Sequence, residues 1–115
     1  THRQAEDIVL DKNEINGVVL RLSNGIGCPV SPEVNCWMLI ANDLCRQAVC
    51  DGHLILRGSG QDKRDFIPIS EVARAVNYFL RLDSSHLQDG LFNLGSGIEI
   101  STLTLAEKIV VIQKN

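Results

Sequence analysis

The run from Gly17 to Leu22, GVVLRL, constrains the fold of this chain more than any other feature of its sequence. An apolar run rich in β-branched residues is typical of a strand buried on both faces of a parallel sheet. The segment that follows, SNGIGCPVSP, is rich in turn-forming residues and is predicted to be a loop. Open α/β sheets bind their ligands at the carboxyl ends of such strands, so we expect a ligand site directly after Leu22.

The rest of the sequence alternates helical patterns with short strands. Apolar residues at helical spacing predict helices over residues 2–12 and 35–49, a third helix capped by Ser70 with Glu71 in its first turn, and a last helix capped by Ser101. Short strands are predicted at residues 54–57, 66–69, 91–94 and 98–100. Strands and helices that alternate at this spacing predict an α/β fold.

Length, composition and charge narrow the class of protein. At 115 residues, with 44% hydrophobic and 22% charged residues, the chain fits one small globular domain. The net charge of −3 argues against a nucleic-acid-binding surface. The apolar run Trp37 to Ala41 is too short to cross a bilayer, so we expect no membrane segment and a cytoplasmic location. Both ends read as helix interiors and no methionine begins the chain, so we expect a portion of a longer protein.

The four cysteines do not follow a metal-binding pattern. They stand at Cys28, Cys36, Cys45 and Cys50, without a C-x-x-C pair and without histidines at ligand-like spacing. We therefore expect buried free thiols and no metal site.

The turn Gly95-Ser96-Gly97 follows an apolar strand and so resembles the start of a dinucleotide-binding loop. The third glycine of that pattern would fall at Ile100, and the residues that follow read as strand rather than helix. An ordinary turn is therefore favoured over a phosphate-binding loop. The sequence also has no G-x-x-x-x-G-K-[ST] motif and no G-x-S-x-G motif, which removes the usual triphosphate-binding and hydrolase patterns.

Three polar residues at the ends of predicted elements are candidates for ligand binding. Arg64 lies between a glycine turn and a short apolar strand, where its planar guanidinium can bind a phosphate. The alternative, favoured on residue type alone, is a surface ion pair with Asp62 or Asp65. Asn24 can donate and accept hydrogen bonds to a sugar or a phosphate, although asparagine is also an ordinary turn residue. Asn35 has helix capping as its alternative role.

Taken in order, GVVLRLSNGIGCP, LILRGSGQDKRDFIPISEVARAV and LFNLGSGIEISTLTLAEKI resemble the C-terminal half of the extended short-chain dehydrogenases. These are the NAD-dependent nucleotide-sugar epimerases and dehydratases. The resemblance covers residues 2–110 and is carried by L-R-x-x-N-x-x-G, R-D-F-I and F-N-L-G-S-G-x-x-x-S together. It implies part of a Rossmann-like doubly wound sheet with a small substrate-binding lobe. Residues 1–115 would then be the C-terminal substrate-binding portion, without the half that binds NAD or NADP.

The resemblance also implies where cofactor chemistry would take place. The family's catalytic Tyr-x-x-x-Lys pair is not in this chain, and its tyrosine would lie upstream of Thr1. Counted back from Glu6, His2 stands at the position of the lysine that contacts the nicotinamide ribose. A histidine would supply the positive charge of the lysine only when its imidazole is protonated. The alternative is that His2 merely begins a helix. Ser23 would lie near the nicotinamide carboxamide.

For the substrate, the resemblance implies that Asn24, Asn35 and Arg64 contact the nucleotide diphosphate or the sugar. Asp65 and Phe66 would be structural. A further arginine of the family that binds the same diphosphate would lie beyond Asn115.

We therefore expect the substrate-binding part of an NAD-dependent nucleotide-sugar epimerase or dehydratase of polysaccharide biosynthesis, and we expect this part to be inactive by itself. NAD would belong to the full-length protein and would not bind tightly to these residues alone. The expected partners are a nucleotide sugar and a second copy of the chain, paired through the helix that starts near His2. One alternative, favoured by the histidine at position 2, is a non-catalytic relative that uses the fold for binding or assembly. Another is an unrelated α/β interaction domain in which every motif is structural.

Overall fold

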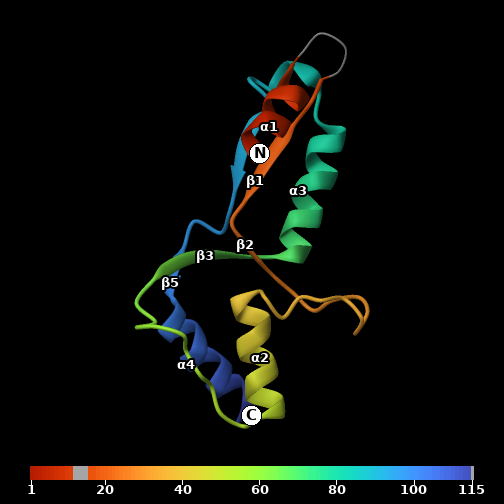
Figure 1. The fold of residues 1–115 in the computed structure, drawn as a ribbon. Helices are drawn as coiled ribbons and strands as arrows, with labels where there is room; N and C mark the ends of the chain where they lie inside the picture. The colour runs from red at the N-terminus through yellow and green to blue at the C-terminus, as the bar shows by residue number, and fades with distance from the viewer. Residues whose placement is uncertain (12–15, 115) are drawn as a thin grey trace.

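The computed structural model of the chain describes residues 1–11 and 16–114 (Figure 1). Within these residues the elements follow in the order α1 (His2–Leu10), β1 (Val19–Leu22), β2 (Asn24–Ile26), α2 (Ile40–Cys50), β3 (Lys63–Pro68), α3 (Ile69–Arg81), a 3₁₀ turn (Ser84–His86), β4 (Leu91–Leu94), β5 (Glu99–Ser101) and α4 (Thr102–Gln113). The predicted end of the first helix, Lys12, lies outside the described residues. None of the described helices is long and apolar enough to cross a membrane.

The strands form two small sheets. β1 pairs in parallel with β4, from Val19 opposite Leu91 to Leu22 opposite Leu94. β2 pairs in parallel with β3, which also pairs antiparallel with β5, so the second sheet has the order β2-β3-β5. The predicted α/β class with parallel strands is confirmed.

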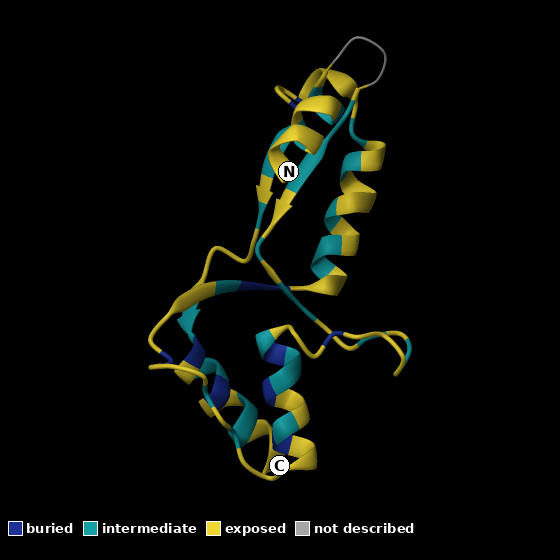
Figure 2. Ribbon diagram, viewed as in Figure 1, coloured by how far each residue is buried: buried dark blue, intermediate teal, exposed yellow. Residues whose placement is uncertain are grey.

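The molecule is elongated. Its principal extents are 54 × 29 × 24 Å and its radius of gyration is 17.5 Å, whereas a compact domain of 100 residues has a radius of about 13 Å. In Figure 1, α1, β1, β4 and α3 form one end, and β3, β5, α2 and α4 form the other. Buried residues gather at the second end, on β3 and on the facing sides of α2 and α4 (Figure 2). The described parts of α1 and α3 contain no buried residue.

The starts of the helices show which capping predictions hold. Ser101 caps α4 as predicted, because its side chain accepts the N–H of Thr104 at 3.0 Å. The cap predicted at Ser70 is wrong. α3 begins one residue earlier, at Ile69, and Pro68 occupies the capping position without a side-chain hydrogen bond. Glu71 does lie in the first turn of α3, where the helix dipole favours a negative charge.

Three of the predicted elements also differ from the structure. The predicted loop of residues 23–32 contains β2, because β3 supplies a pairing partner that local sequence does not reveal. The strand predicted at residues 54–57 does not form, and the N–H of Ile55 donates instead to the side-chain oxygen of Gln47 at 2.7 Å. The helix predicted from Asn35 begins at Ile40, after a segment of turns.

Candidate functional site

The turn Gly95-Ser96-Gly97 binds a carboxylate of the chain itself. The carboxylate of Asp65 on β3 accepts the N–H of Ser96 at 2.9 Å and the N–H of Gly97 at 2.6 Å. Gly97 has a φ of 75°, a conformation that favours glycine. A Cβ atom at Gly95 would approach the Asp65 carboxylate oxygens to 3.0 Å. The turn is therefore an ordinary structural turn, as predicted, and its N–H groups are occupied by Asp65.

These hydrogen bonds lower the pKa of the Asp65 carboxyl group. The N–H of Ser96 is the largest cause of a pKa lowered from the usual value of the carboxyl group. The hydroxyl of Ser23 also lies near enough to lower this pKa, but it forms no hydrogen bond of good geometry within the described residues. Asp65 is therefore an ionised structural group at neutral pH.

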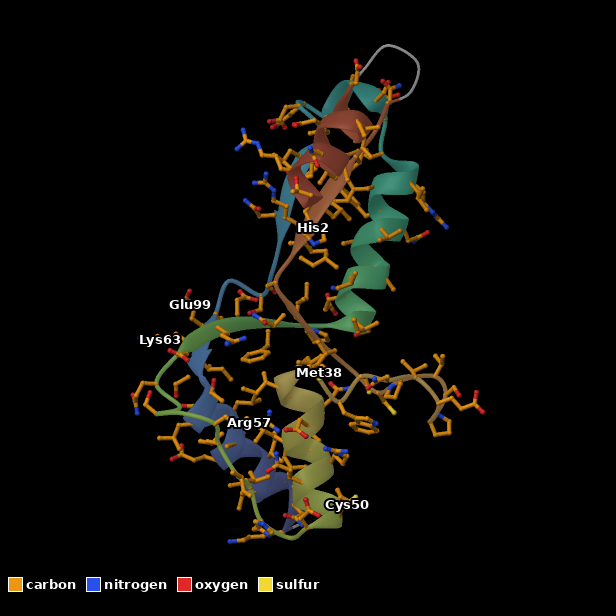
Figure 3. The ribbon with its side chains drawn as sticks, viewed as in Figure 1. His2, Met38, Cys50, Arg57, Lys63 and Glu99 are labelled. Carbon is orange, nitrogen blue, oxygen red and sulfur yellow. The ribbon has the colours of Figure 1, made fainter. Side chains whose placement is uncertain are left out.

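Arg64 faces away from Asp65, because successive side chains of a strand point to opposite faces of the sheet. Arg64 and Phe66 share one face of β3 and line a cavity of about 510 Å³. We call it the arginine cavity. It is lined by Asn24, Gly25, Trp37, Met38, Leu39, Ile40, Ala41, Asp43, Leu44, Arg46, Ile55, Leu56, Arg57, Arg64 and Phe66. The cavity is bordered by β2, by β3, by the amino end of α2 and by residues 55–57. Figure 3 labels Met38 just before the amino end of α2.

Three arginines and one carboxylate line this cavity. Arg46 already has partners within the protein. Its guanidinium forms an ion pair with Asp43 at 2.9 Å and lies 5.3 Å from the centre of the Trp37 ring. The hydrogen bond from Arg46 is the largest cause of a lowered Asp43 pKa, so this carboxylate is charged and offsets one arginine. The guanidinium groups of Arg57 and Arg64 form no ion pair or hydrogen bond in the part of the chain that the structure describes.

The alternative predicted for Arg64, a surface ion pair with Asp62 or Asp65, is therefore not found in the described part of the chain. No ion pair joins Arg64 to Asp62 or Asp65 within the described residues. Asn24 lines the same cavity, and its amide nitrogen donates to the backbone oxygen of Asp65 at 3.0 Å. That bond fixes the Asn24 amide beside β3 while the residue stays exposed. The structure thus brings together two of the predicted site residues.

Asn35 lies apart from them. It is exposed in the turns before α2 and does not line the arginine cavity. Helix capping by Asn35 is wrong, because the capping position of α2 is Leu39, which provides no side-chain hydrogen bond. The N–H groups of the first turn of α2 are therefore left without a side-chain cap where that helix borders the cavity.

His2 and Ser23 do not line the arginine cavity; His2 begins α1 and Ser23 directly follows β1. The Glu6 carboxylate binds the Arg21 guanidinium through two contacts of 2.9 and 2.7 Å, which hold α1 against β1. His2 is one helical turn before Glu6, at the end of α1 nearest the carboxyl end of β1 (Figure 3). The N–H of Ser23 donates to the Leu94 carbonyl at 2.9 Å and so continues the pairing of β1 with β4.

A second cavity, of about 880 Å³, lies between α2 and α4 and is mostly apolar. Cys28, Cys45 and Cys50 all line it. The cysteines are free, as predicted, but only Cys36 is buried, so the prediction of burial is wrong for the other three. On α2 the buried residues are Ala41, Leu44 and Ala48, whereas Cys45 and Cys50 are exposed, and Cys28 is exposed in the segment after β2. Partial burial raises the pKa of Cys45. No cluster that would hold a metal ion occurs among the described residues.

Arg57 and Arg46 also line the arginine cavity, although neither was predicted from the sequence as a site residue. Arg57 had a readable signal, because the segment Gly58-Ser59-Gly60 has an arginine shortly before it and Arg64 shortly after it. A glycine turn of this kind can bring its two flanks to one side. Arg46 had no such signal, since its position on a helix face depends on where α2 begins.

Parallel strands connected through helices define a Rossmann-like α/β protein. Residues 1–95 match the model of the NAD dependent epimerase/dehydratase family. This match covers more than half of the chain, and the chain belongs to that family. A search of curated proteins finds no match.

Solved structures show the same fold. dTDP-glucose 4,6-dehydratase of Bacillus anthracis in complex with NAD aligns with 96% of this chain and 34% of its own, at 20% identity and a TM-score of 0.74. UDP-glucose 4-epimerase of Thermus thermophilus in complex with NAD aligns with 98% of this chain and 36% of its own, at 17% identity and a TM-score of 0.72. An epimerase of Methanothermobacter thermautotrophicus aligns with 97% of this chain and 32% of its own, at 21% identity and a TM-score of 0.74. The chain therefore spans about a third of the length of these proteins.

Proposed function

We propose that this chain is the substrate-binding portion of an NAD-dependent nucleotide-sugar epimerase or dehydratase, and that its arginine cavity binds the nucleotide diphosphate. One observation carries the proposal. Asn24 and Arg64 come from different strands, line one cavity, and Arg64 has no anionic partner within the described residues. The family of the chain and the names of the structures that share its fold support the same conclusion.

The chemistry of these side chains suits a diphosphate. The guanidinium of Arg64 can donate two parallel hydrogen bonds to phosphate oxygens, and its charge does not depend on pH near neutrality. The Asn24 amide can donate to a phosphate or accept from a sugar hydroxyl. The uncapped amino end of α2 adds partial positive charge on the same side of the cavity.

In this proposal, NAD would lie beyond the carboxyl ends of β1 and β4, where open α/β sheets bind ligands. NAD supplies the reversible acceptor for a hydride from the sugar. The hydroxyl of Ser23 makes no hydrogen bond of good geometry within the described residues, so in this proposal it is available to bind a carboxamide there. His2 would hydrogen-bond the nicotinamide ribose and, when protonated, lower the pKa of a neighbouring tyrosine.

The test is binding of UDP and dTDP to the full-length protein by calorimetry. We expect Arg64→Ala to weaken the binding by about 1.5–3 kcal/mol, the cost of one charge-assisted contact. The matched control is Arg81→Ala, an exposed arginine at the end of α3 that does not line the cavity. Equal affinity of Arg64→Ala and wild type would disprove the diphosphate role.

The second candidate is a non-catalytic relative that binds the nucleotide sugar without turning it over. The position of His2 favours it, because a histidine stands where we place the lysine of the family. Assays of the full-length protein with UDP-glucose, dTDP-glucose and NAD separate the two. Turnover supports the enzyme, and binding without turnover supports the relative.

A further inference from the structure

Arg57 lines the arginine cavity but has no part in the function proposed above. We propose that Arg57 is a second anion-binding residue, which together with Arg64 selects ligands with two adjacent phosphates over ligands with one. The inference rests on the proposed function, since it concerns the same cavity. It assigns to Arg57 the discrimination between a nucleoside diphosphate and a nucleoside monophosphate.

The backbone around Arg57 is fixed on both sides. Before it, the N–H of Ile55 donates to the Gln47 side chain of α2 at 2.7 Å. After it, the carbonyl of Gly60 accepts the N–H of Leu103 at the start of α4 at 2.9 Å. Gly60 has a φ of 70°, and an added Cβ there would meet Leu56 at 3.1 Å. Arg57 is therefore held on the wall of the cavity by neighbours from two helices.

Arg57 lines the cavity next to α2. Arg57 lies beside that helix (Figure 3). The pKa of Asp43 on α2 is lowered first by the hydrogen bond from Arg46 and, to a smaller extent, by the positive charge of Arg57. Arg64 reaches the same cavity from β3. The two arginines thus line the cavity from different parts of the chain, Arg57 from the segment before β3 and Arg64 from β3 itself.

The balance of charge indicates a ligand with two negative groups. Asp43 is the one acid that lines the cavity, and it forms its ion pair with Arg46, whereas no ion pair of Arg57 or Arg64 occurs among the described residues. Two like charges around one cavity repel each other unless anions lie between them. A diphosphate supplies two adjacent anionic groups and so matches both arginines.

The experiment measures binding of UDP, UMP and uridine, and of the corresponding thymidine compounds, to the full-length protein. We compare wild type with Arg57→Gln, Arg57→Lys, Arg64→Gln and the control Arg81→Gln. Wild type is expected to prefer the diphosphate over the monophosphate. Arg57→Gln is expected to weaken diphosphate binding about 10-fold and monophosphate binding much less. Arg57→Lys keeps the charge and should retain part of the preference, which provides a reading even if Arg57→Gln does not fold.

Each outcome has a separate meaning. If wild type binds no nucleoside diphosphate, both the proposed function and this inference are wrong. If Arg64→Gln loses binding while Arg57→Gln and Arg57→Lys keep the wild-type preference for diphosphate, the proposed function stands and this inference alone is overturned.

Discussion

The carboxylate of Asp65 accepts the backbone N–H of Gly97 at 2.6 Å, and through this bond β3 is joined to the turn that follows β4. The two sheets share no strand, so this bond and that of Ser96 are links between the two ends of the molecule. Asp65→Asn replaces the carboxylate with an amide and weakens both bonds. We expect a lower midpoint of thermal unfolding. Asp62→Asn, an exposed acid three residues earlier, is the control and should unfold like wild type.

The same group predicts a pH dependence. The folded protein lowers the pKa of Asp65 below the usual value of 3.8, with the N–H of Ser96 as the largest cause. Because the folded pKa is the lower one, the stabilisation is fully present above about pH 4 and is lost as the pH falls through the folded pKa. We expect the stability difference between wild type and Asp65→Asn to be constant at higher pH and to shrink as the pH falls below about 4 and through the folded pKa. A difference that is constant with pH, measured by chemical denaturation, would contradict this account.

Two glycines of the turn are expected to resist substitution for different reasons. An added Cβ at Gly97 meets no atom within 4 Å, so Gly97→Ala carries only the backbone cost of a φ of 75°, about 1–2 kcal/mol. Gly95→Ala instead forces a methyl group against the Asp65 carboxylate at 3.0 Å. Combined with Asp65→Ala, the Gly95 substitution should lose most of its additional effect, whereas the Gly97 substitution should not. A double-mutant cycle on unfolding free energies measures the difference.

The small core predicts a large effect at Leu44 on α2, which is 2% exposed. Leu44→Ala should destabilise the protein by about 2–5 kcal/mol, because it leaves a cavity between α2 and its neighbours. The matched substitution is Leu80→Ala on α3, where the leucine is 80% exposed and the expected effect is within about 0.5 kcal/mol. Equal effects in denaturant unfolding would show that the core does not lie where α2 packs.

Local sequence predicted those elements whose own residues determine them. β4 has its predicted bounds, and β1 lies within the predicted run at residues 17–22. Ser101 caps α4 through a hydrogen bond only three residues away. In contrast, β2 consists of Asn24, Gly25 and Ile26, two of which disfavour strands, and it forms because β3 pairs with it.

The candidate site divides in the same way. Asn24 and Arg64 were predicted from strand ends and from a family resemblance, and the structure places both on one cavity. Arg57 was missed because residues 54–57 read as a strand. The hydrogen bond between Ile55 and Gln47, which holds that segment beside α2, joins residues whose contact no local pattern encodes. The role of Asn35 as a cap was wrong because turns delay the start of α2 to Ile40.

Arg64 and Asp65 are neighbours on β3 with opposite surroundings, and this adjacency gives the turn after β4 a second consequence. A slip of β3 by one residue against its partner strands would exchange the two faces. The carboxylate would then enter the cavity and the guanidinium would face the N–H groups of Ser96 and Gly97. A guanidinium that faces two N–H donors would be electrostatically unfavourable, and those donors would lose their acceptor. The turn that binds Asp65 therefore also sets the register of β3, and with it the sign of the charge that this strand presents to a ligand.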